Sequence, residues 1–287
     1  MSVTMDGMAY SFGARLPARA DRSAQYMLLR LLLGGGVVRK SNSRNGYSQQ
    51  MDLSCWPSVA QTRSSASATS EFLSVQMGRS VGNFISETIL DNRRLFSEML
   101  SEISNYYCST GTGAHASAFV YLYRSLERMS FSVPLLYCAT SSDFQGTFDS
   151  LKRLFDEGAG GDLSLLRKFV DGGRFLDPTV VDSTITVDFS MSPHGGKYYH
   201  AVTSRFSDTE ACDPVLRQIV IKFGKMQGLL ETLRNRFFHF RSGDGRNNIS
   251  ARDLIDVDEF FALLNPALEN FICKLILQSI TLKYRRR

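Results

Sequence analysis

The amino-acid sequence predicts an all-α fold of two long helical hairpins with an irregular segment inserted between them. Three observations predict it. Apolar residues recur at three- and four-residue spacings over two long stretches of the chain. A short glycine-containing turn divides the first stretch, and a polar loop divides the second. Between the two stretches, residues 141–210 consist of short elements and loops.

The first 75 residues differ in composition from the rest of the chain. They are rich in Ser, Gly, Arg and Gln and include the polar run Ser41–Gly46. This composition predicts a loosely ordered N-terminal extension over 1–75, with one or two short elements, one of them around Ala24–Leu33. The helical domain is then expected over 76–287, with the insert at about 141–210.

The first hairpin is predicted between Val81 and Tyr137. From Val81 to about Tyr107 the pattern indicates one long amphipathic helix, whose apolar positions are Phe84, Ile85, Ile89, Leu95, Phe96, Met99, Leu100 and Ile103. Ser109–Gly113 ends that helix, and a second helix follows from about Ala114 to Tyr137. Pro134 is expected to kink or interrupt this second helix near its end.

The insert is predicted to hold short helices at Gly146–Asp156 and Leu163–Asp171. Thr179–Phe189 alternates and is rich in β-branched residues, which indicates a strand or an extended loop, with a short helix as the alternative. The glycine-rich run Gly158–Gly161 lacks the Lys-Ser/Thr ending of a phosphate loop, so we interpret it as a linker.

The second hairpin is predicted over about Asp213–Phe240 and Ala251–Lys283. Asp213-Pro214 supplies a capping residue and a proline suited to the first helical position. Ser250–Asp253 resembles a capping box at the start of the last helical segment. Within that segment, Pro266 predicts two helices that meet just before it.

Composition limits the classes of function. A net charge of +5 and a pI near 9.0 are a mild basic bias that agrees with a polyanionic partner. The five cysteines are scattered without a Cys-x-x-Cys pair, which predicts free thiols in a reducing compartment and no zinc site. No stretch reaches the roughly 20 apolar residues that span a bilayer. We therefore expect a cytoplasmic protein with no membrane segment, metal or cofactor.

The most informative stretch is Leu233–Phe240, near the end of a predicted long helix. It sets Arg234, Asn235 and His239 within six residues, between apolar residues that can anchor them. An arginine that stabilises a phosphorane, a polar positioning group and an imidazole that titrates near neutrality suffice for metal-free RNA cleavage. The stretch therefore predicts a ribonuclease site.

The spacing Arg-Asn-x-x-x-His in this stretch resembles the motif of the HEPN superfamily. These are small helical domains, many of which are dimeric ribonucleases in toxin–antitoxin and phage-defence systems. The resemblance covers about residues 80–140 and 210–284 and implies a HEPN-like bundle of two hairpins. It also implies RNA as substrate and a homodimer in which two motifs line one cleft. Because an uncontrolled ribonuclease would harm its own cell, we expect an antitoxin, a sensor or another trigger as a partner.

The resemblance assigns a role to each motif residue. The 2′-hydroxyl of RNA would attack the adjacent phosphorus and give a 2′,3′-cyclic phosphate and a free 5′-hydroxyl. His239 would transfer the proton, either from the 2′-hydroxyl or to the leaving 5′-oxygen. Arg234 would stabilise charge on the phosphorane oxygens. Asn235 would hydrogen-bond the phosphate or orient His239.

Further RNA contacts are expected from residues close to the motif. Arg236 and Arg241 are the nearest additional cations for flanking phosphates, with a solvated helix face as the alternative. HEPN proteins often place a polar residue of the second helix beside the motif. Glu127 and Ser130 are the candidates here, and the alternative for Glu127 is a surface ion pair with a neighbouring arginine.

The geometry of a straight helix leaves one problem. Asn235 and His239 would share a face, whereas Arg234 and His239 would lie about 140° apart. A distortion at the helix end, or a second copy of the motif across a two-fold axis, would let both reach one phosphate.

Two other classes of function stay open: a HEPN-like domain that binds RNA, a nucleotide or a protein without cleavage, and a helical adaptor. The adaptor hypothesis expects His239 to be buried against its phenylalanine neighbours.

Overall fold

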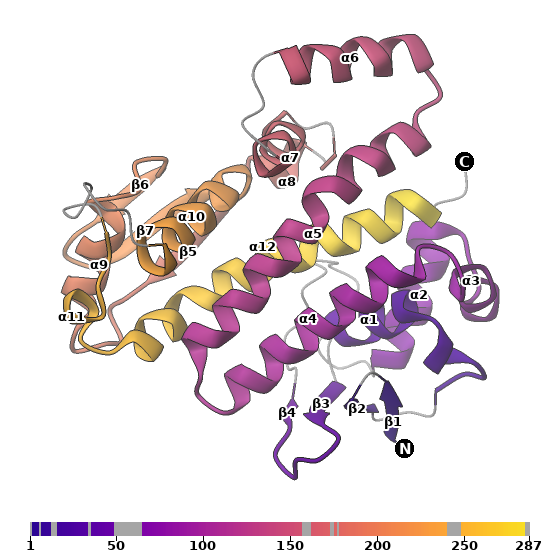
Figure 1. Cartoon of the computed structure of the whole chain (residues 1–287), viewed down its shortest axis with the longest axis horizontal. Coiled ribbons are helices and arrows are strands. Elements are labelled where there is room, and N and C mark those ends of the chain that lie inside the picture. Colours follow the sequence, from indigo (N-terminus) through magenta and orange to yellow (C-terminus); the bar gives the residue numbers. More distant parts are fainter. Residues whose placement is uncertain are drawn as a thin grey trace. The chain divides into compact units, whose positions relative to one another are not determined.

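The computed structural model describes residues 2–5, 7–12, 16–33, 36–48, 65–156, 162–172, 175–176, 178–239 and 248–284. These residues are mainly helical but also form two small antiparallel sheets, so the fold is α+β and the prediction of a strictly all-α chain is wrong (Figure 1). The chain divides into two compact units. Unit 1 comprises Met1–Ala114 and Ile272–Arg287, and unit 2 comprises His115–Phe271.

Unit 1 opens with a four-stranded sheet in the order β1-β2-β3-β4. The strands are β1 (Ser2–Met5), β2 (Met8–Phe12), β3 (Gly36–Lys40) and β4 (Tyr47–Ser48). After the short turn η1 (Ala20–Arg22), helix α1 (Ala24–Leu32) connects β2 with β3, and all nine of its residues are buried. The sequence predicted a loosely ordered extension here with a short element around Ala24–Leu33, and α1 corresponds to that element. The described part is ordered because α1 is almost wholly apolar and is stabilised by burial.

The remaining helices of unit 1 are α2 (Ser65–Met77), α3 (Val81–Thr88) and α4 (Arg93–Gly111). The single helix predicted from Val81 to Tyr107 is therefore two helices. The chain turns between them, where Asn92 adopts a left-handed conformation with φ 48°. Asn and Asp tolerate this conformation better than other residues with side chains, so the break has a local cause.

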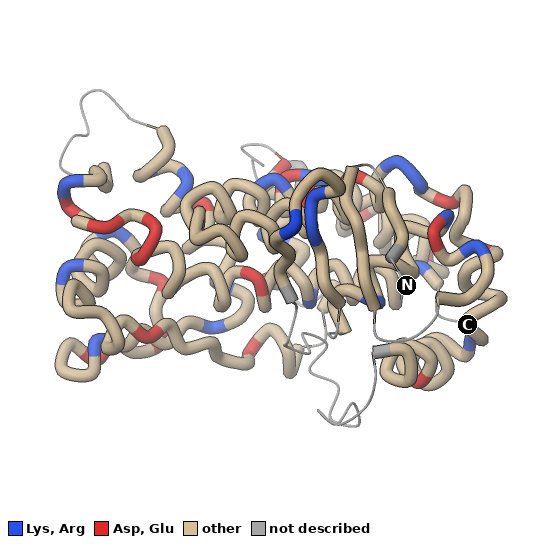
Figure 2. Tube along the Cα trace, turned by 90° about the horizontal axis from the view of Figure 1, so that it is seen from below, with Lys and Arg blue, Asp and Glu red and all other residues tan. Residues whose placement is uncertain are grey.

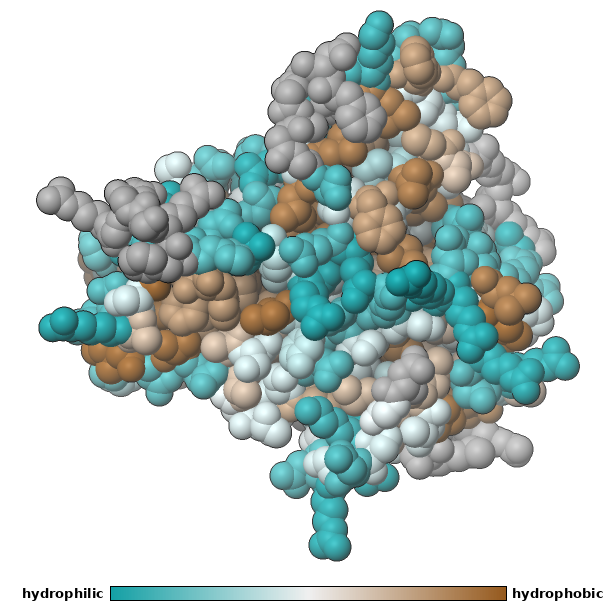
Figure 3. Space-filling view, in the orientation of Figure 1, coloured by the Kyte–Doolittle hydropathy of each residue, from teal (hydrophilic) through white to brown (hydrophobic). Residues whose placement is uncertain are grey.

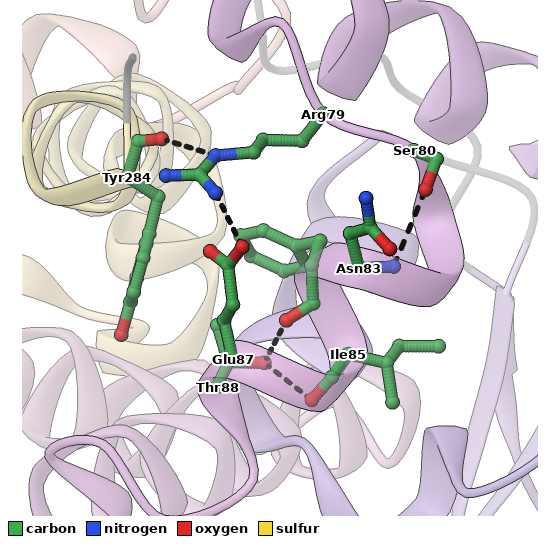
Figure 4. A network of polar contacts seen from close by, with 8 residues as sticks. Arg79, Ser80, Asn83, Ile85, Glu87, Thr88 and Tyr284 are labelled. Atoms are coloured by element: carbon green, nitrogen blue, oxygen red, sulfur yellow. Dashed lines mark hydrogen bonds and ion pairs between the residues drawn. The ribbon is translucent and has the colours of Figure 1, made fainter. Parts of the chain in front are cut away.

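A polar network fixes the end of the last helix, α12 (Val257–Tyr284), within unit 1 (Figure 4). The Tyr284 hydroxyl donates to Asp91 Oδ2 at 2.8 Å and accepts from Gln25 Nε2 at 3.2 Å. Arg79 Nε donates to the Tyr284 carbonyl oxygen at 3.1 Å, and the same guanidinium pairs with Glu87. Burial and the neighbouring Asp91 raise the pKa of Tyr284.

Unit 2 begins with the long helix α5 (His115–Thr140), followed by α6 (Phe144–Asp156), α7 (Asp162–Asp171) and the single turn α8 (Pro178–Val181). Pro134 lies inside α5, which continues beyond it for six residues, so the helix is not interrupted there. The two short helices predicted in the insert correspond to α6 and α7. Phe144 and Phe148 of α6 are 82% and 62% exposed, and hydrophobic side chains reach the surface in this region (Figure 3).

The second sheet has the order β5-β7-β6, formed by β5 (Thr184–Asp188), β6 (Ala211–Asp213) and β7 (Gln218–Lys222). The last residue of β6 and the whole of β7 fall within the beginning of the helix predicted over 213–240, so that part of the prediction is wrong. Asp213 Oδ1 accepts hydrogen bonds from the amides of Val215 and Leu216, both at 2.8 Å, and closes a hairpin turn. Ile219 and Ile221 of β7 are buried in alternation with more exposed neighbours, as in a half-buried strand.

The other elements of unit 2 are α9 (Gly195–Thr203), η2 (Phe223–Lys225), α10 (Met226–Leu233), η3 (Arg234–Phe238) and α11 (Ala251–Leu254). The predicted capping box at Ser250 and Asp253 is present and starts α11. The last segment does break, but at Ile255, where φ is 66°, and Pro266 lies inside α12. Among the described helices, α12 alone has the length and apolar composition to cross a membrane, a test that buried core helices also pass.

Candidate functional site

The Arg-Asn-x-x-x-His motif lies on a distorted helix end. Helix α10 continues as η3, a π-helical turn over Arg234–Phe238, and His239 follows in an extended conformation with φ −116° and ψ 97°. A π turn closes hydrogen bonds between residues i and i+5, so it reduces the angle between residues that lie about 140° apart on a straight α-helix. The structure thus contains the kind of distortion that would bring Arg234 and His239 closer in direction.

Aromatic packing holds the π turn in place. Phe238 stacks on Phe119 of α5 with ring centroids 5.4 Å apart and planes at 3°, and Phe237 contacts Phe261 of α12 at 5.3 Å. These ring contacts anchor one side of the turn to α5 and α12. His239 is exposed to solvent. The adaptor hypothesis expected a buried imidazole at this position, and the structure does not have it.

Arg234 and Asn235 line an open pocket between α5, α7 and α10, with a volume of about 580 Å³. The guanidinium carbon of Arg234 lies 5.0 Å from the centroid of the Tyr123 ring, within the range of a cation–π interaction. Arg234 Nη1 also donates to Asn235 Oδ1 at 3.0 Å. The ring and the amide therefore hold the guanidinium at the wall of the pocket.

Residues of α5 complete this wall. Tyr123, Glu127 and Ser130 stand at four- and three-residue spacings and line the pocket from one helical face. Burial raises the pKa of Tyr123 to about 12, Arg234 opposes this, and a hydrogen bond to Glu127 adds to it. The structure thus brings Glu127, predicted from the sequence, into one pocket with Arg234 and Asn235.

Carboxylates outnumber cations in this pocket. Among the described residues that line it, Glu127, Asp162 and Glu231 are carboxylates and Arg234 is the one cation. Glu231 is paired with Arg167 and accepts a hydrogen bond from Gln227 Nε2 at 2.7 Å, which offsets part of the negative charge. The interior still favours cationic groups. A phosphate would be stabilised only at the side of the pocket that Arg234 and Asn235 form.

The other charged or titratable residues predicted near the motif, His239 and Arg236, do not line this pocket. Arg236 is half-buried within the π turn, and Arg241 lies outside the described residues. Over the ranges that the structure describes, no three His, Cys, Asp or Glu side chains are grouped so that they could hold a metal ion.

Sequence reasoning did not identify Tyr123, Asp162 or Glu231 as part of the site. The four-residue spacing of Tyr123 and Glu127 on α5 was a usable signal for the first of them. Asp162 reaches the pocket from α7, through tertiary packing that no local pattern encodes.

Comparison of the chain with protein-family models, with curated proteins and with solved structures finds no match. Function is therefore inferred from the motif and its surroundings.

Proposed function

We propose that this protein is a metal-independent endoribonuclease of the HEPN type that acts as a toxin or phage-defence effector. The observation that supports the proposal most is the exposed His239 at the end of a π turn whose first residues, Arg234 and Asn235, line an open pocket. Proton transfer needs an imidazole that solvent and substrate can reach, and charge stabilisation needs a cation at an open surface. Both conditions are met.

The proposed active site forms between two copies of the chain. His239 does not line the pocket of its own chain, so a two-fold arrangement is needed to bring it to Arg234 of a second copy. Exposed apolar residues that stand four apart on α5 and on α6 provide surface for association. They are Phe131, Leu135, Phe144 and Phe148.

Each residue then has a defined part in the reaction. His239 removes the proton of the attacking 2′-hydroxyl or protonates the departing 5′-oxygen. Arg234, oriented by Tyr123, donates to the equatorial oxygens of the phosphorane as negative charge builds there. Asn235 accepts from Arg234 through Oδ1, which leaves its amide N–H groups to donate to the same phosphate. The products are a 2′,3′-cyclic phosphate and a 5′-hydroxyl.

The first test is cleavage of total RNA in EDTA. We expect the wild type to cut, with 2′,3′-cyclic phosphate ends, and His239→Ala and Arg234→Ala to be inactive. Arg94→Ala is the matched control, because its side chain is 93% exposed on α4, and it should retain full activity. Activity in His239→Ala equal to that of the wild type would refute the assignment.

A mixing experiment tests the composite site. Heterodimers of His239→Ala and Arg234→Ala contain one intact pair, an imidazole from one chain and a guanidinium from the other. Random exchange of the two inactive variants should therefore restore about a quarter of the wild-type activity. If each chain carries its own complete site, mixing restores nothing.

The acidic interior of the Arg234 pocket favours a second candidate function. Glu127, Asp162 and Glu231 would repel a polyphosphate but suit a lysine or arginine side chain of a protein partner. A non-cleaving interaction module is the function that remains if the wild type, tested as dimer and in any co-purified complex, does not cut RNA. In that case Glu127→Gln should weaken binding of the co-purified protein, while His239→Ala should not.

A further inference from the structure

Unit 2 contains a second open pocket, between α9 and α11, with a volume of about 490 Å³. This is enough room for a group of nucleotide size. The polar side chains that line it are Lys197, His200, Ser204, Arg205, Arg252 and Asp253. In contrast to the Arg234 pocket, cationic groups outnumber carboxylates here.

Helix geometry brings these side chains together. Lys197, His200 and Ser204 stand at three- and four-residue spacings, so they share one face of α9 and the turn that follows it. Arg252 approaches from the first turn of α11, whose start is fixed by the capping box of Ser250 and Asp253. The pocket is thus formed by two helical elements that local hydrogen bonds define.

Among the described residues, Asp253 is the one carboxylate that lines the pocket, and hydrogen bonds from Ser250 hold it. Asp253 Oδ2 accepts from the Ser250 amide at 2.9 Å and from the Ser250 hydroxyl at 2.8 Å, and these bonds lower the pKa of Asp253. Within the described part of the chain, Lys197 and His200 have no hydrogen bond or ion pair from their side chains. Among the described residues that line the pocket, cationic side chains therefore outnumber the carboxylate, which favours an anion.

Arg205 contributes a fixed charge to the wall. Its Nη1 donates to the Ala201 carbonyl oxygen at 3.1 Å, and its Nη2 donates to the Asn248 carbonyl oxygen at 2.9 Å. These two bonds fix the direction of the guanidinium at the wall of the pocket. A preorganised cation of this kind binds an oxyanion at a low entropic cost.

The concentration of cations is local. Figure 2 shows Lys and Arg interspersed with Asp and Glu along the chain. The overall charge of +5 is thus the sum of a mixed surface. The predominance of cations among the described residues of this pocket is therefore a local feature of the surface.

Hydrogen bonds connect this pocket with the π turn of the motif. Asn248 accepts from Arg205 at the pocket wall, and the amide of the next residue, Ile249, donates to the Arg236 carbonyl oxygen at 2.7 Å. Two consecutive residues therefore join the pocket to the turn that ends at His239. An RNA strand at His239 carries a phosphate at every nucleotide, so phosphates beside the cleaved bond are available to a site joined to this turn.

We propose that the pocket between α9 and α11 binds a backbone phosphate of single-stranded RNA. This inference rests on the proposed function, because it takes the RNA to be the strand presented to His239. Lys197 and Arg252 donate to the phosphate oxygens from the two walls, and His200 adds a third donor. Arg205 lines the pocket with them.

The test uses a fluorescein-labelled single-stranded RNA with a 2′-O-methyl group on every ribose, which cannot be cleaved by 2′-hydroxyl attack. Binding is measured by fluorescence anisotropy over a range of salt concentrations. Lys197→Gln/Arg252→Gln should bind at least about tenfold more weakly than the wild type, with a salt dependence reduced by about two phosphate contacts. The control Lys152→Gln/Arg153→Gln removes the same charge from exposed residues of α6 and should change affinity less than about twofold.

Repeating the titration with His239→Ala separates this proposal from the proposed catalysis. One outcome is that neither the wild type nor any variant cleaves natural RNA, while the pocket variant still binds the labelled RNA more weakly. That outcome supports the phosphate site and refutes the proposed ribonuclease activity. Equal affinities of the pocket and control variants overturn the phosphate site. Binding of AMP by the pocket without binding of the RNA also overturns it, in favour of a mononucleotide site. All four substituted residues are exposed, and circular dichroism checks that each variant folds.

Discussion

Gly195, the first residue of α9, lies against the backbone of Phe189. A Cβ atom on Gly195 would stand 2.0 Å from the Phe189 carbonyl oxygen and 3.0 Å from its carbonyl carbon. Both are backbone atoms, and carbon contacts normally lie at about 3.5–4.0 Å, so one chain segment must move by about 1 Å or more. We expect Gly195→Ala to lower the free energy of unfolding by about 1–3 kcal/mol. Because α9 carries Lys197 and His200, the same variant should also bind the labelled RNA more weakly.

The neighbouring Gly196 provides the control. A Cβ there meets nothing within 4 Å, and the residue is exposed. Gly196→Ala should therefore raise the free energy of unfolding by up to about 1 kcal/mol, since alanine loses less conformational entropy in a helix. Urea unfolding followed by circular dichroism measures both variants, compared at unchanged m value. Equal stability of the two variants would refute the close approach of α9 to Phe189.

Three further outcomes are expected. Tyr284→Phe keeps the ring contact with Phe84 but removes the hydroxyl that donates to Asp91, and urea unfolding should show a loss of about 1–2 kcal/mol. Thermal unfolding between pH 9 and 12 should show stability falling above about pH 10, where unfolded tyrosine ionises first. Burial raises the pKa of Tyr123 to about 12 and also raises the pKa of Tyr284, so the contribution of the two hydroxyls is complete below pH 10 and is lost as the pH rises; a flat profile would contradict this. Ser250→Ala removes the hydroxyl that accepts from the Asp253 amide and donates to the Asp253 carboxylate, while the backbone bond of the capping box remains, and should lower the free energy of unfolding by about 1 kcal/mol, measured by urea titration.

Much of the helical structure could be predicted from the sequence because local pattern decides it. The starts and ends of α5, α6 and α7 follow three- and four-residue apolar spacings, and the Ser250–Asp253 box acts within four residues. The strand β7 could not be predicted in the same way. Ile219 and Ile221 fit a helical apolar face as well as a strand, and pairing with β5, far away in the sequence, decides between them.

The candidate site also has parts that the local sequence pattern predicts and parts that depend on tertiary packing. The motif residues Arg234, Asn235 and His239 were found from their spacing, and Glu127 from the expected position of the second helix. The sequence allowed a distortion at this helix end but did not predict the π turn. The aromatic contacts that support the turn come from α5 and α12, which are distant in the sequence. The acidic character of the Arg234 pocket and the basic pocket at α9 and α11 arise from tertiary packing, which spacing along one helix does not report.

The division of α12 between the two units has a consequence for protein synthesis. Unit 1 consists of Met1–Ala114 together with Ile272–Arg287, so its first residues leave the ribosome long before its last. At roughly 5–20 residues per second, on the order of ten to thirty seconds pass between the two segments. During that interval Gln25, Arg79 and Phe84 lack their partner Tyr284. Unit 1 is therefore completed only after the ribosome has synthesised the whole of unit 2, including the Arg234–His239 motif. A nascent chain halted before residue 284 exposes the polar and aromatic groups that Tyr284 would cover.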